Sequence, residues 1–400
     1  MKWVCLLAVM RRYIFIILLL LSLQGLAQTS VLSDKAEIRV VTCGPFQGEL
    51  YSAFGHSAFR IYDPLLGFDW IYNYGLFDFN QPNFYLNFAR GNLNYRLGVQ
   101  EYTQFRDTYI YYNRFVHEQQ LNLTAEQKQK LFDFLEWNAL PENQYYRYDY
   151  FYDNCATKIR DVIQHVFGDT VKFDDSYIRT NYTIRDLTEL YLQHQPWGDL
   201  GIDICLGLPM DKKASPYEYM FLPDYIESSF EHATINNSST SSPLVKEKII
   251  TYQSQPEKFV FSIFHPWIVF GFILIIGTGL TYYDFKRKRL SKWFDTLLFG
   301  VVGLIGLLLL LLWLATDHKA AAKNFNLLWA LPTHFIVLVW FWKQNKPNWF
   351  RSYFRIVSML QLAVLVVWFF LPQQLNVFLM PLVILLMIRC WIISKLTEQI

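Results

Sequence analysis

The sequence has few charged residues for its length and no strong charge of either sign. Asp, Glu, Lys and Arg make up 18% of its 400 residues, and the formal net charge is only +2. Soluble globular proteins carry about 25% charged residues, so a wholly soluble chain is disfavoured. A nearly neutral chain also lacks the electrostatic footprint of a nucleic-acid-binding protein, so we expect no nucleic-acid partner. No internal repeat is present.

Metal-binding motifs are missing as well. The spacings CxxC, HxxxH and HExxH do not occur between residues 28 and 265, although such spacings are typical of zinc sites. We therefore predict no metal and no cofactor.

Cysteines are scarce, and only five occur in the chain. Cys5 and Cys390 lie in apolar stretches near the two ends, which leaves Cys43, Cys155 and Cys205 between them. An odd number means that at least one of the three is unpaired within the chain. A disulfide between Cys43 and Cys205 remains open at this stage.

Apolar residues are abundant, at 53%, and the first group of them indicates a secretory signal over residues 1–27. Arg11 and Arg12 precede an apolar run over 13–23, which is short for a membrane span, and Ala27 offers a cleavage site. Met10 fits this layout as the true start. An uncleaved anchor helix is the alternative.

The rest of the chain divides by composition into three parts. Residues 28–232 have the mixed character of a globular domain, and residues 233–264, with the polar stretch NNSSTSSP, predict a linker. Residues 265–400 contain apolar segments long enough to cross a bilayer as helices. We count five such segments: 266–283, 296–315, 325–342, 354–371 and 375–393.

Loop charges give the orientation of these five segments. Positive residues collect in the first loop, over 286–292, and in the third, over 343–355, whereas the second and fourth loops have few or none. Positive loops face the cytoplasm. This places the N-terminal domain on the exported side and the C-terminus in the cytoplasm, as the signal peptide also predicts.

Residues 28–232 have the pattern of an α+β domain. Strands are predicted over 36–45, 56–64 and 69–77, the last two as a hairpin. Helices are predicted where apolar residues recur at helical spacing after a capping residue. Their caps are Thr124, Asp153 or Asn154, and Thr183.

Cys155 is the candidate nucleophile of this domain. It stands in the first turn of a predicted helix, where unpaired N–H groups and the helix dipole favour a thiolate. His56 directly follows Gly55 at the start of a predicted strand, and a base can be distant from its nucleophile in sequence. A strand histidine facing a helix-start cysteine is the arrangement of papain-like sites. From the residues alone, structural roles for both side chains stay open.

Six motifs in order resemble the N-terminal periplasmic domain of Lnb-type lipoprotein N-acyltransferases, over roughly residues 36 to 232. They are FGHSAFRIYD, YNYGLFDF, FARGNLNYRL, YFYDNCATKIRD, PWGDLGIDICLGLPMD and MFLPDYI. The five-segment region is similar to the one that accompanies that domain. The domain also resembles permuted papain-like enzymes, the NlpC and lecithin:retinol acyltransferase groups. The fold implied is an α+β permuted papain-like domain followed by an all-α five-helix transmembrane domain.

The resemblance implies an enzyme of the inner, cytoplasmic membrane that N-acylates lipoproteins. Cys155 would take an acyl chain from a phospholipid as a thioester, and His56 would act as base while the lipoprotein α-amine accepts the chain. Asn73 is our choice for the residue that orients His56, although strand register cannot be read from the sequence. The backbone N–H of Cys155 is the expected oxyanion donor.

Polar residues near the outer face of the membrane region are candidates for substrate binding. They are His318, Asn326 and His334, and polar groups within spans tend to be functional. Hydrogen bonding between helices is the equally ranked alternative. Two other functions stay open for the whole protein: an NlpC-type cell-wall amidase or peptidase, and a non-catalytic membrane-anchored binding module.

Overall fold

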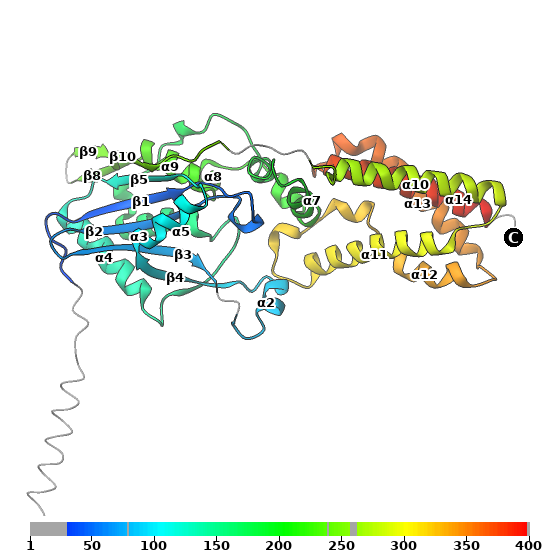
Figure 1. Cartoon of the computed structure of the whole chain (residues 1–400), viewed down its shortest axis with the longest axis horizontal. Coiled ribbons are helices and arrows are strands. Elements are labelled where there is room, and N and C mark those ends of the chain that lie inside the picture. The colour runs from blue at the N-terminus through cyan, green and yellow to red at the C-terminus, as the bar shows by residue number, and fades with distance from the viewer. Residues whose placement is uncertain (1–29, 78–79, 238–239, 257–261, 398–400) are drawn as a thin grey trace, which may run out of the picture.

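The computed structural model describes residues 30–77, 80–237, 240–256 and 262–397. A domain built on a β-sheet comes first, and a bundle of long helices follows it (Figure 1). The α+β domain and the helical region that the sequence predicts are thereby confirmed. The predicted signal peptide, residues 1–27, lies outside the described residues.

The N-terminal domain is organised around a seven-stranded sheet in the order β10-β5-β1-β2-β3-β4-β6. Every neighbouring pair is antiparallel. The strands are β1 (Glu37–Cys43), β2 (His56–Asp63), β3 (Phe68–Leu76), β4 (Asn94–Glu101), β5 (Val116–Leu121), β6 (Tyr145–Arg147) and β10 (Val245–Tyr252). The predicted hairpin is the β2–β3 pair, joined at Asp63 and Phe68.

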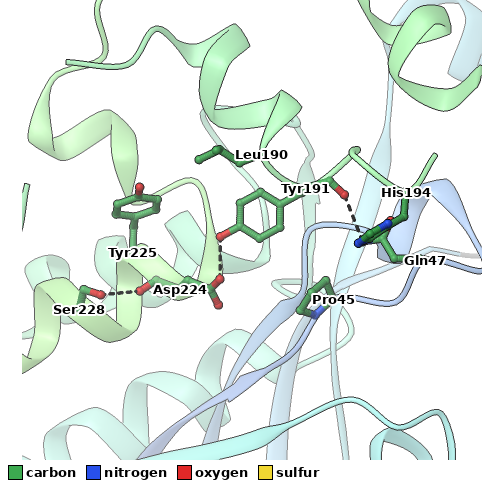
Figure 2. A pocket seen from close by; sticks show the side chains of 8 residues that line it. All are labelled: Pro45, Gln47, Leu190, Tyr191, His194, Asp224, Tyr225 and Ser228. Carbon is green, nitrogen blue, oxygen red and sulfur yellow. Dashed lines mark hydrogen bonds between the residues drawn. The ribbon is translucent and has the colours of Figure 1, made fainter. Parts of the chain in front are cut away.

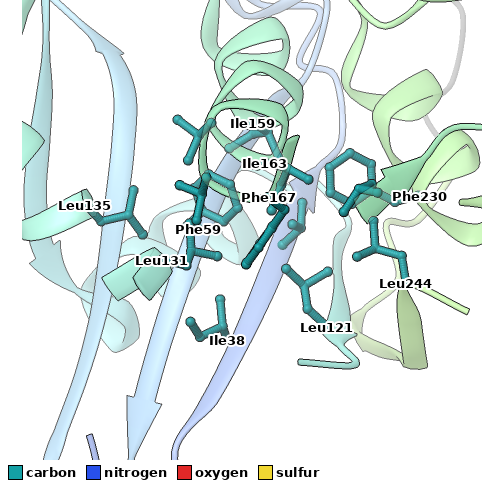
Figure 3. Packing of buried hydrophobic residues seen from close by; sticks show 14 of the residues in the cluster. Ile38, Phe59, Leu121, Leu131, Leu135, Ile159, Ile163, Phe167, Phe230 and Leu244 are labelled. Carbon is teal, nitrogen blue, oxygen red and sulfur yellow. The ribbon is translucent and has the colours of Figure 1, made fainter. Parts of the chain in front are cut away.

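Helices cover both faces of this sheet. The helices of the domain are α2 (Phe84–Arg90), α3 (Tyr102–Tyr111), α4 (Ala125–Ala139), α5 (Cys155–Phe167), α6 (Ile184–Glu189), α7 (Pro196–Cys205), α8 (Pro216–Tyr219) and α9 (Pro223–His232). Ile159 and Ile163 of α5 pack on Phe59 of β2, in a core to which α4 and α9 also contribute (Figure 3). On the opposite face, Phe105 of α3 covers Ala58 of the same strand. Alternate residues of β2 therefore enter two different cores.

Three helices begin at the capping residues that the sequence predicts. Thr124 and Thr183 each accept a hydrogen bond from the third residue of their helix, α4 and α6. Asn154 does the same for α5 and also accepts from its second residue. Each cap satisfies N–H groups that a helix start leaves unpaired.

The prediction of a linker over residues 233–264 is wrong for most of its length. The polar stretch pairs as a hairpin of β8 (Thr234–Asn237) and β9 (Thr240–Pro243), which joins β7 (Val171–Lys172) in a second sheet. β10 then pairs with β5 at the edge of the main sheet. Backbone hydrogen bonding explains this outcome, because an edge strand gains a partner whatever its side chains are.

The C-terminal bundle contains α10 (Pro266–Arg287), α11 (Lys292–Leu314), α12 (His334–Trp342), α13 (Asn348–Val367) and α14 (Met380–Leu396). In the described part of the chain, four helical stretches are long and apolar enough to cross a membrane, and they contain α10, α11, α13 and α14. The third predicted segment runs along the bundle in two pieces, a 3-10 turn over Phe325–Leu328 and the short α12. Pro332 lies between the two pieces, where its ring opposes a continuous helix.

A buried ion network joins three helices of the bundle. Arg389 of α14 donates to Asp284 of α10 and to Asp295 of α11, and all three side chains are fully buried. Ser291 donates to Asp284 across the loop between α10 and α11. Paired charges of this kind hold helices in one arrangement, because breaking one pair leaves the other charge uncompensated.

The second and fourth loops of the bundle contact the N-terminal domain. Asp317 pairs with Arg147 at 2.6 Å, and Gln373 donates to the carbonyl of Leu206 at 3.0 Å. The first and third loops, which carry most of the positive charge, therefore lie at the far end of the bundle (Figure 1).

Candidate active site

Cys155 is the first residue of α5, and a network around Asn154 fixes its position. The Asn154 Oδ1 accepts from the N–H groups of Ala156 and Thr157, each at 2.9 Å. Its Nδ2 donates to the carbonyl of Phe221 at 2.8 Å. Asn154 is therefore the helix cap that the sequence predicts, and its amide is engaged by protein groups on both sides.

His56 is the first residue of β2, and Gly55 allows the chain to turn into that strand. Gly55 has φ +82°, and a Cβ atom there would lie 2.8 Å from the carbonyl oxygen of Cys43. Only glycine fits both conditions. Because His56 pairs with Cys43 of β1, the imidazole is held at a defined position at the end of the sheet.

Asn73 of β3 holds the ring of His56. The His56 Nε2 lies 2.6 Å from the Asn73 Oδ1. An amide oxygen can only accept, so Nε2 carries the proton and Nδ1 is left as the acceptor nitrogen. Both residues point to the sheet face covered by α3, because they alternate in phase with Ala58 and Ile71 of the core on that face.

Gly75 lets the helix start approach the strand that carries Asn73. Continuing the β2–β3 register sets Gly75 opposite His56, and the pairing of β3 with β4 shifts between Asn73 and Leu76. Gly75 has φ +93°, and a Cβ added to it would lie 3.5 Å from the Cys155 Cβ. Cys155 thus reaches the end of the His56–Asn73 pair through space that the glycine leaves open.

The environment keeps both candidate groups in their neutral forms. Burial raises the pKa of the Cys155 thiol, while hydrogen bonding from the N–H groups of Ser57, Ala156 and Cys155 lowers it by less. Burial also lowers the pKa of His56 to about 4, although the Asn73 hydrogen bond opposes that shift. The predicted thiolate preference at the helix start is therefore outweighed by desolvation. A neutral thiol beside a neutral imidazole needs proton transfer at the moment of attack.

Arg114 belongs to the surroundings of this site and is not evident from the sequence. Its guanidinium donates to the carbonyl of Gly44 at 2.6 Å and lies 4.4 Å from the ring centroid of Tyr109. The Tyr109 ring in turn stacks beside His56, with centroids 6.3 Å apart. The positive charge of Arg114 lowers the pKa of both Cys155 and His56, so it favours a developing negative charge at the sulfur.

The cysteines of the described chain make no disulfide. Cys43, Cys155, Cys205 and Cys390 are all free, so the pairing of Cys43 with Cys205 that the sequence leaves open is not formed. Among the described residues, no group of three His, Cys, Asp or Glu side chains is placed to hold a metal ion.

Asn326 joins the two domains. Its Nδ2 donates to the Asp203 carbonyl of α7 at 3.1 Å, and its Oδ1 accepts from the indole of Trp329 at 2.8 Å. Asn326 is 1% exposed. These are contacts that position one domain on the other, as the alternative of structural hydrogen bonding predicts.

His318 and His334 also bond to protein groups, each in a different part of the molecule. The His318 Nε2 donates to the Phe88 carbonyl of α2 at 3.1 Å, so this side chain too joins the domains. His334 is fully buried in the bundle, with its Nδ1 2.8 Å from the Tyr353 hydroxyl. The structure thus brings Cys155, His56 and Asn73 together and leaves His318, Asn326 and His334 outside that constellation.

A cavity of about 540 Å³ lies beyond the end of β1. Figure 2 shows Asp224 held by Tyr191 at one wall, and Gln47 bonded to the Tyr191 carbonyl at another. Cys155, His56 and Asn73 are not among the lining residues. The candidate catalytic residues therefore do not line this cavity.

Comparisons with known proteins match both halves of the chain to one family. The family model described as the Lnb N-terminal periplasmic domain matches residues 26–190. The model described as the Lnb transmembrane domain matches residues 257–399. Searches of curated proteins and of solved structures found no match.

Proposed function

Because the chain belongs to the Lnb family, we propose that it transfers an acyl chain from a phospholipid to the α-amine of a diacylglyceryl-cysteine lipoprotein. The family supports acyl transfer, and the attached membrane bundle gives access to substrates that are both anchored in lipid. The observation that carries the mechanism is the His56–Asn73 hydrogen bond of 2.6 Å at the strand end that Cys155 approaches.

The first half of the reaction forms a thioester on Cys155. The thiol proton moves to the Nδ1 of His56 as the sulfur attacks the ester carbonyl of the phospholipid. The carbon–oxygen bond then breaks, and the imidazolium returns the proton to the departing lysophospholipid hydroxyl. Asn73 keeps Nε2 protonated throughout and so keeps Nδ1 available. The N–H groups that surround the sulfur are the candidate donors to the developing oxyanion.

The second half regenerates the thiol. The lipoprotein amine attacks the thioester carbonyl, and His56 accepts the proton that the amine loses. The carbon–sulfur bond breaks, and the sulfur takes that proton back from His56. A low-water site suits this step because water would compete with the amine. Burial of the Cys155 surroundings, which raises the thiol pKa, agrees with such a site.

We also place the sheet domain in the periplasm and the C-terminus in the cytoplasm, across the inner membrane. The supporting observation is that the two loops richest in Lys and Arg lie at the end of the bundle away from the sheet domain. A reporter that is active only in the cytoplasm, fused after Ile400, should be active. Activity of a reporter that works only in the periplasm, fused at the same position, would contradict this orientation.

The test of the function is direct N-acylation by the purified full-length protein. A phospholipid and a diacylated lipopeptide are incubated with it, and mass spectrometry follows the N-acyl lipopeptide. Product should form with the unmodified protein and with Cys205→Ala, and fall below detection with Cys155→Ala. The matched control is informative because both cysteines are free. Cleavage of a peptidoglycan fragment, with no N-acyl lipopeptide formed, would instead favour the alternative function of a cell-wall amidase.

A further inference from the structure

Helix α2 presents apolar side chains outward at the boundary between the two domains. It buries none of its own residues. Tyr85 is 77% exposed, Leu86 50% and Phe88 41%. A short helix with this surface has no packing reason to be apolar within the sheet domain.

The position of α2 relative to the bundle is fixed by backbone contacts. The Arg90 carbonyl accepts from the Asp317 N–H at 2.9 Å, just after α11 ends at Leu314. Gly91, with φ +78°, permits this approach, since a Cβ there would lie 3.0 Å from the His318 backbone nitrogen. Because α11 is one of the candidate spans, α2 lies at the level where that helix leaves the hydrocarbon. Aromatic side chains are favoured at this depth.

A continuous series of aromatic rings leads from α2 to Cys155. Phe88 lies 6.2 Å from Phe84, Phe84 lies 6.3 Å from Phe77, and Phe77 lies 5.2 Å from Tyr95, measured between ring centroids. Tyr95 stacks on Tyr148 at 4.2 Å. We call these five residues the aromatic track.

The track ends at the candidate nucleophile. A Cβ added to Gly75 would lie 3.8 Å from the Tyr148 ring and 3.5 Å from the Cys155 Cβ. The same glycine therefore borders both the last ring and the sulfur-bearing residue. All five residues along this route are aromatic and none carries a charge, which suits a flexible hydrocarbon chain better than a charged peptide.

We propose that the aromatic track is the binding path for the acyl chain of the donor lipid, with α2 as its entrance at the outer surface of the bilayer. The proposal rests on the function proposed above and adds the side chains that bring the lipid to the thiol. The occupant is a membrane lipid chain, because the entrance is continuous with the end of a candidate span and exposes the apolar side chains of Tyr85, Leu86 and Phe88, with the cationic Arg90 at the end of the helix.

Photo-crosslinking tests the path without requiring turnover. Full-length Cys155→Ala protein is reconstituted in vesicles of a phospholipid with a diazirine in the middle of one acyl chain, irradiated and mapped by mass spectrometry. We expect crosslinks at Phe84, Phe88 or Tyr95, besides those on the bundle helices. Crosslinks confined to α10–α14 would overturn the path and would leave the N-acylation test unaffected.

Substitution of the entrance gives a second readout. Tyr85→Asp with Phe88→Asp should lower Cys155 acylation by vesicle phospholipid at least about tenfold, and change acylation by a short-chain, water-soluble thioester less than about twofold. The matched control is Leu65→Asp with Leu66→Asp, in the β2–β3 turn at the opposite end of β2 from His56, where both side chains are exposed. The control should alter neither rate. Equal loss with both donors, or no loss with either, would contradict the path.

Discussion

The sheet domain and the membrane bundle both hold polar side chains out of water, but they use them differently. In the sheet domain, the His56 Nε2 bonds to Asn73, and Nδ1 is left as the acceptor nitrogen. In the bundle, Arg389 is enclosed by two aspartates. A ring nitrogen left free to accept a proton suits chemistry, whereas a guanidinium whose three nitrogens all donate to protein groups suits assembly. The predictions below test this contrast.

Removal of the base should have the largest effect. In His56→Ala the Cys155 thiol, whose pKa burial raises, has no group to take its proton. We expect Cys155 acylation to fall by about 10³-fold, within the range of general-base contributions. The initial rate of acyl-enzyme formation measures this. His318→Ala, which removes a histidine outside the constellation, should lose less than about threefold, and equal losses in the two variants would break the distinction.

Removal of the orienting residue should have an intermediate effect. Asn73→Ala leaves His56 in place but frees its ring. We expect acylation to be about 10-fold to 100-fold slower, because a small misplacement of a catalytic group costs that much in rate. Asn73→Asp keeps an oxygen acceptor and should retain most activity at neutral pH. Its carboxylate should also raise the His56 pKa, so the acid limb of its pH profile moves upward. A pH profile unchanged in Asn73→Asp would argue against contact between the two side chains in solution.

Removal of an interdomain contact should affect stability more than chemistry. Asn326→Leu removes one donor to the Asp203 carbonyl, which keeps Arg185, and leaves the buried Trp329 indole N–H without its acceptor, at a cost of about 1–3 kcal/mol. We expect a lower thermal midpoint with acylation per folded molecule within about threefold. Asn345→Leu, the same change at an exposed loop position, should leave the midpoint unchanged. A hundredfold loss of acylation in folded Asn326→Leu protein would restore a substrate role for this residue.

Mild acid should have the smallest effect. The pKa of His56 is lowered to about 4 by burial, so the imidazole stays neutral as pH falls from 7.5 to 5.5. Acylation at pH 5.5 should keep at least about 80% of its rate at pH 7.5, whereas a histidine with the ordinary pKa of about 6.5 would keep about a tenth. Protonation below about pH 4 removes the base. Half-maximal acylation near pH 6.5 would show that His56 is not desolvated.

The same lowered pKa affects stability with a definite sign. Between about pH 6.5 and pH 4 the unfolded histidine binds a proton that the folded one does not. The His56 contribution to stability is therefore present above the unfolded pKa and is lost as pH falls through this window.

Local sequence signals predict the elements that carry the site. The caps at Thr124 and Asn154 and the hairpin that presents His56 and Asn73 follow from residue type and alternation. The resemblance to Lnb-type proteins adds the role of Cys155. The residue that bonds to His56 is harder to predict from the sequence, because the strand pairing shifts between Asn73 and Leu76 and alters the alternation just beyond Asn73. The glycine inside a predicted strand is the signal that could have indicated this irregularity.

Long-range contacts account for what the sequence does not predict. β10 mixes apolar and charged residues, buries none of them and pairs with β5 at the edge of the main sheet. The third apolar segment has the length of a span, but it contains Pro332 and sends Asn326 to the carbonyls of α7. Arg114, in the connection between α3 and β5, reaches the surroundings of His56 through Tyr109. None of these partners is close in sequence.

The central claim is that Cys155 carries the acyl chain between donor and acceptor. Full-length protein is incubated with a phospholipid of defined acyl chains and no lipopeptide, digested and analysed by mass spectrometry. The account predicts one acyl chain on the peptide that contains Cys155, released by neutral hydroxylamine and transferred when lipopeptide is added. N-acylated lipopeptide formed at full rate by Cys155→Ala protein would contradict it.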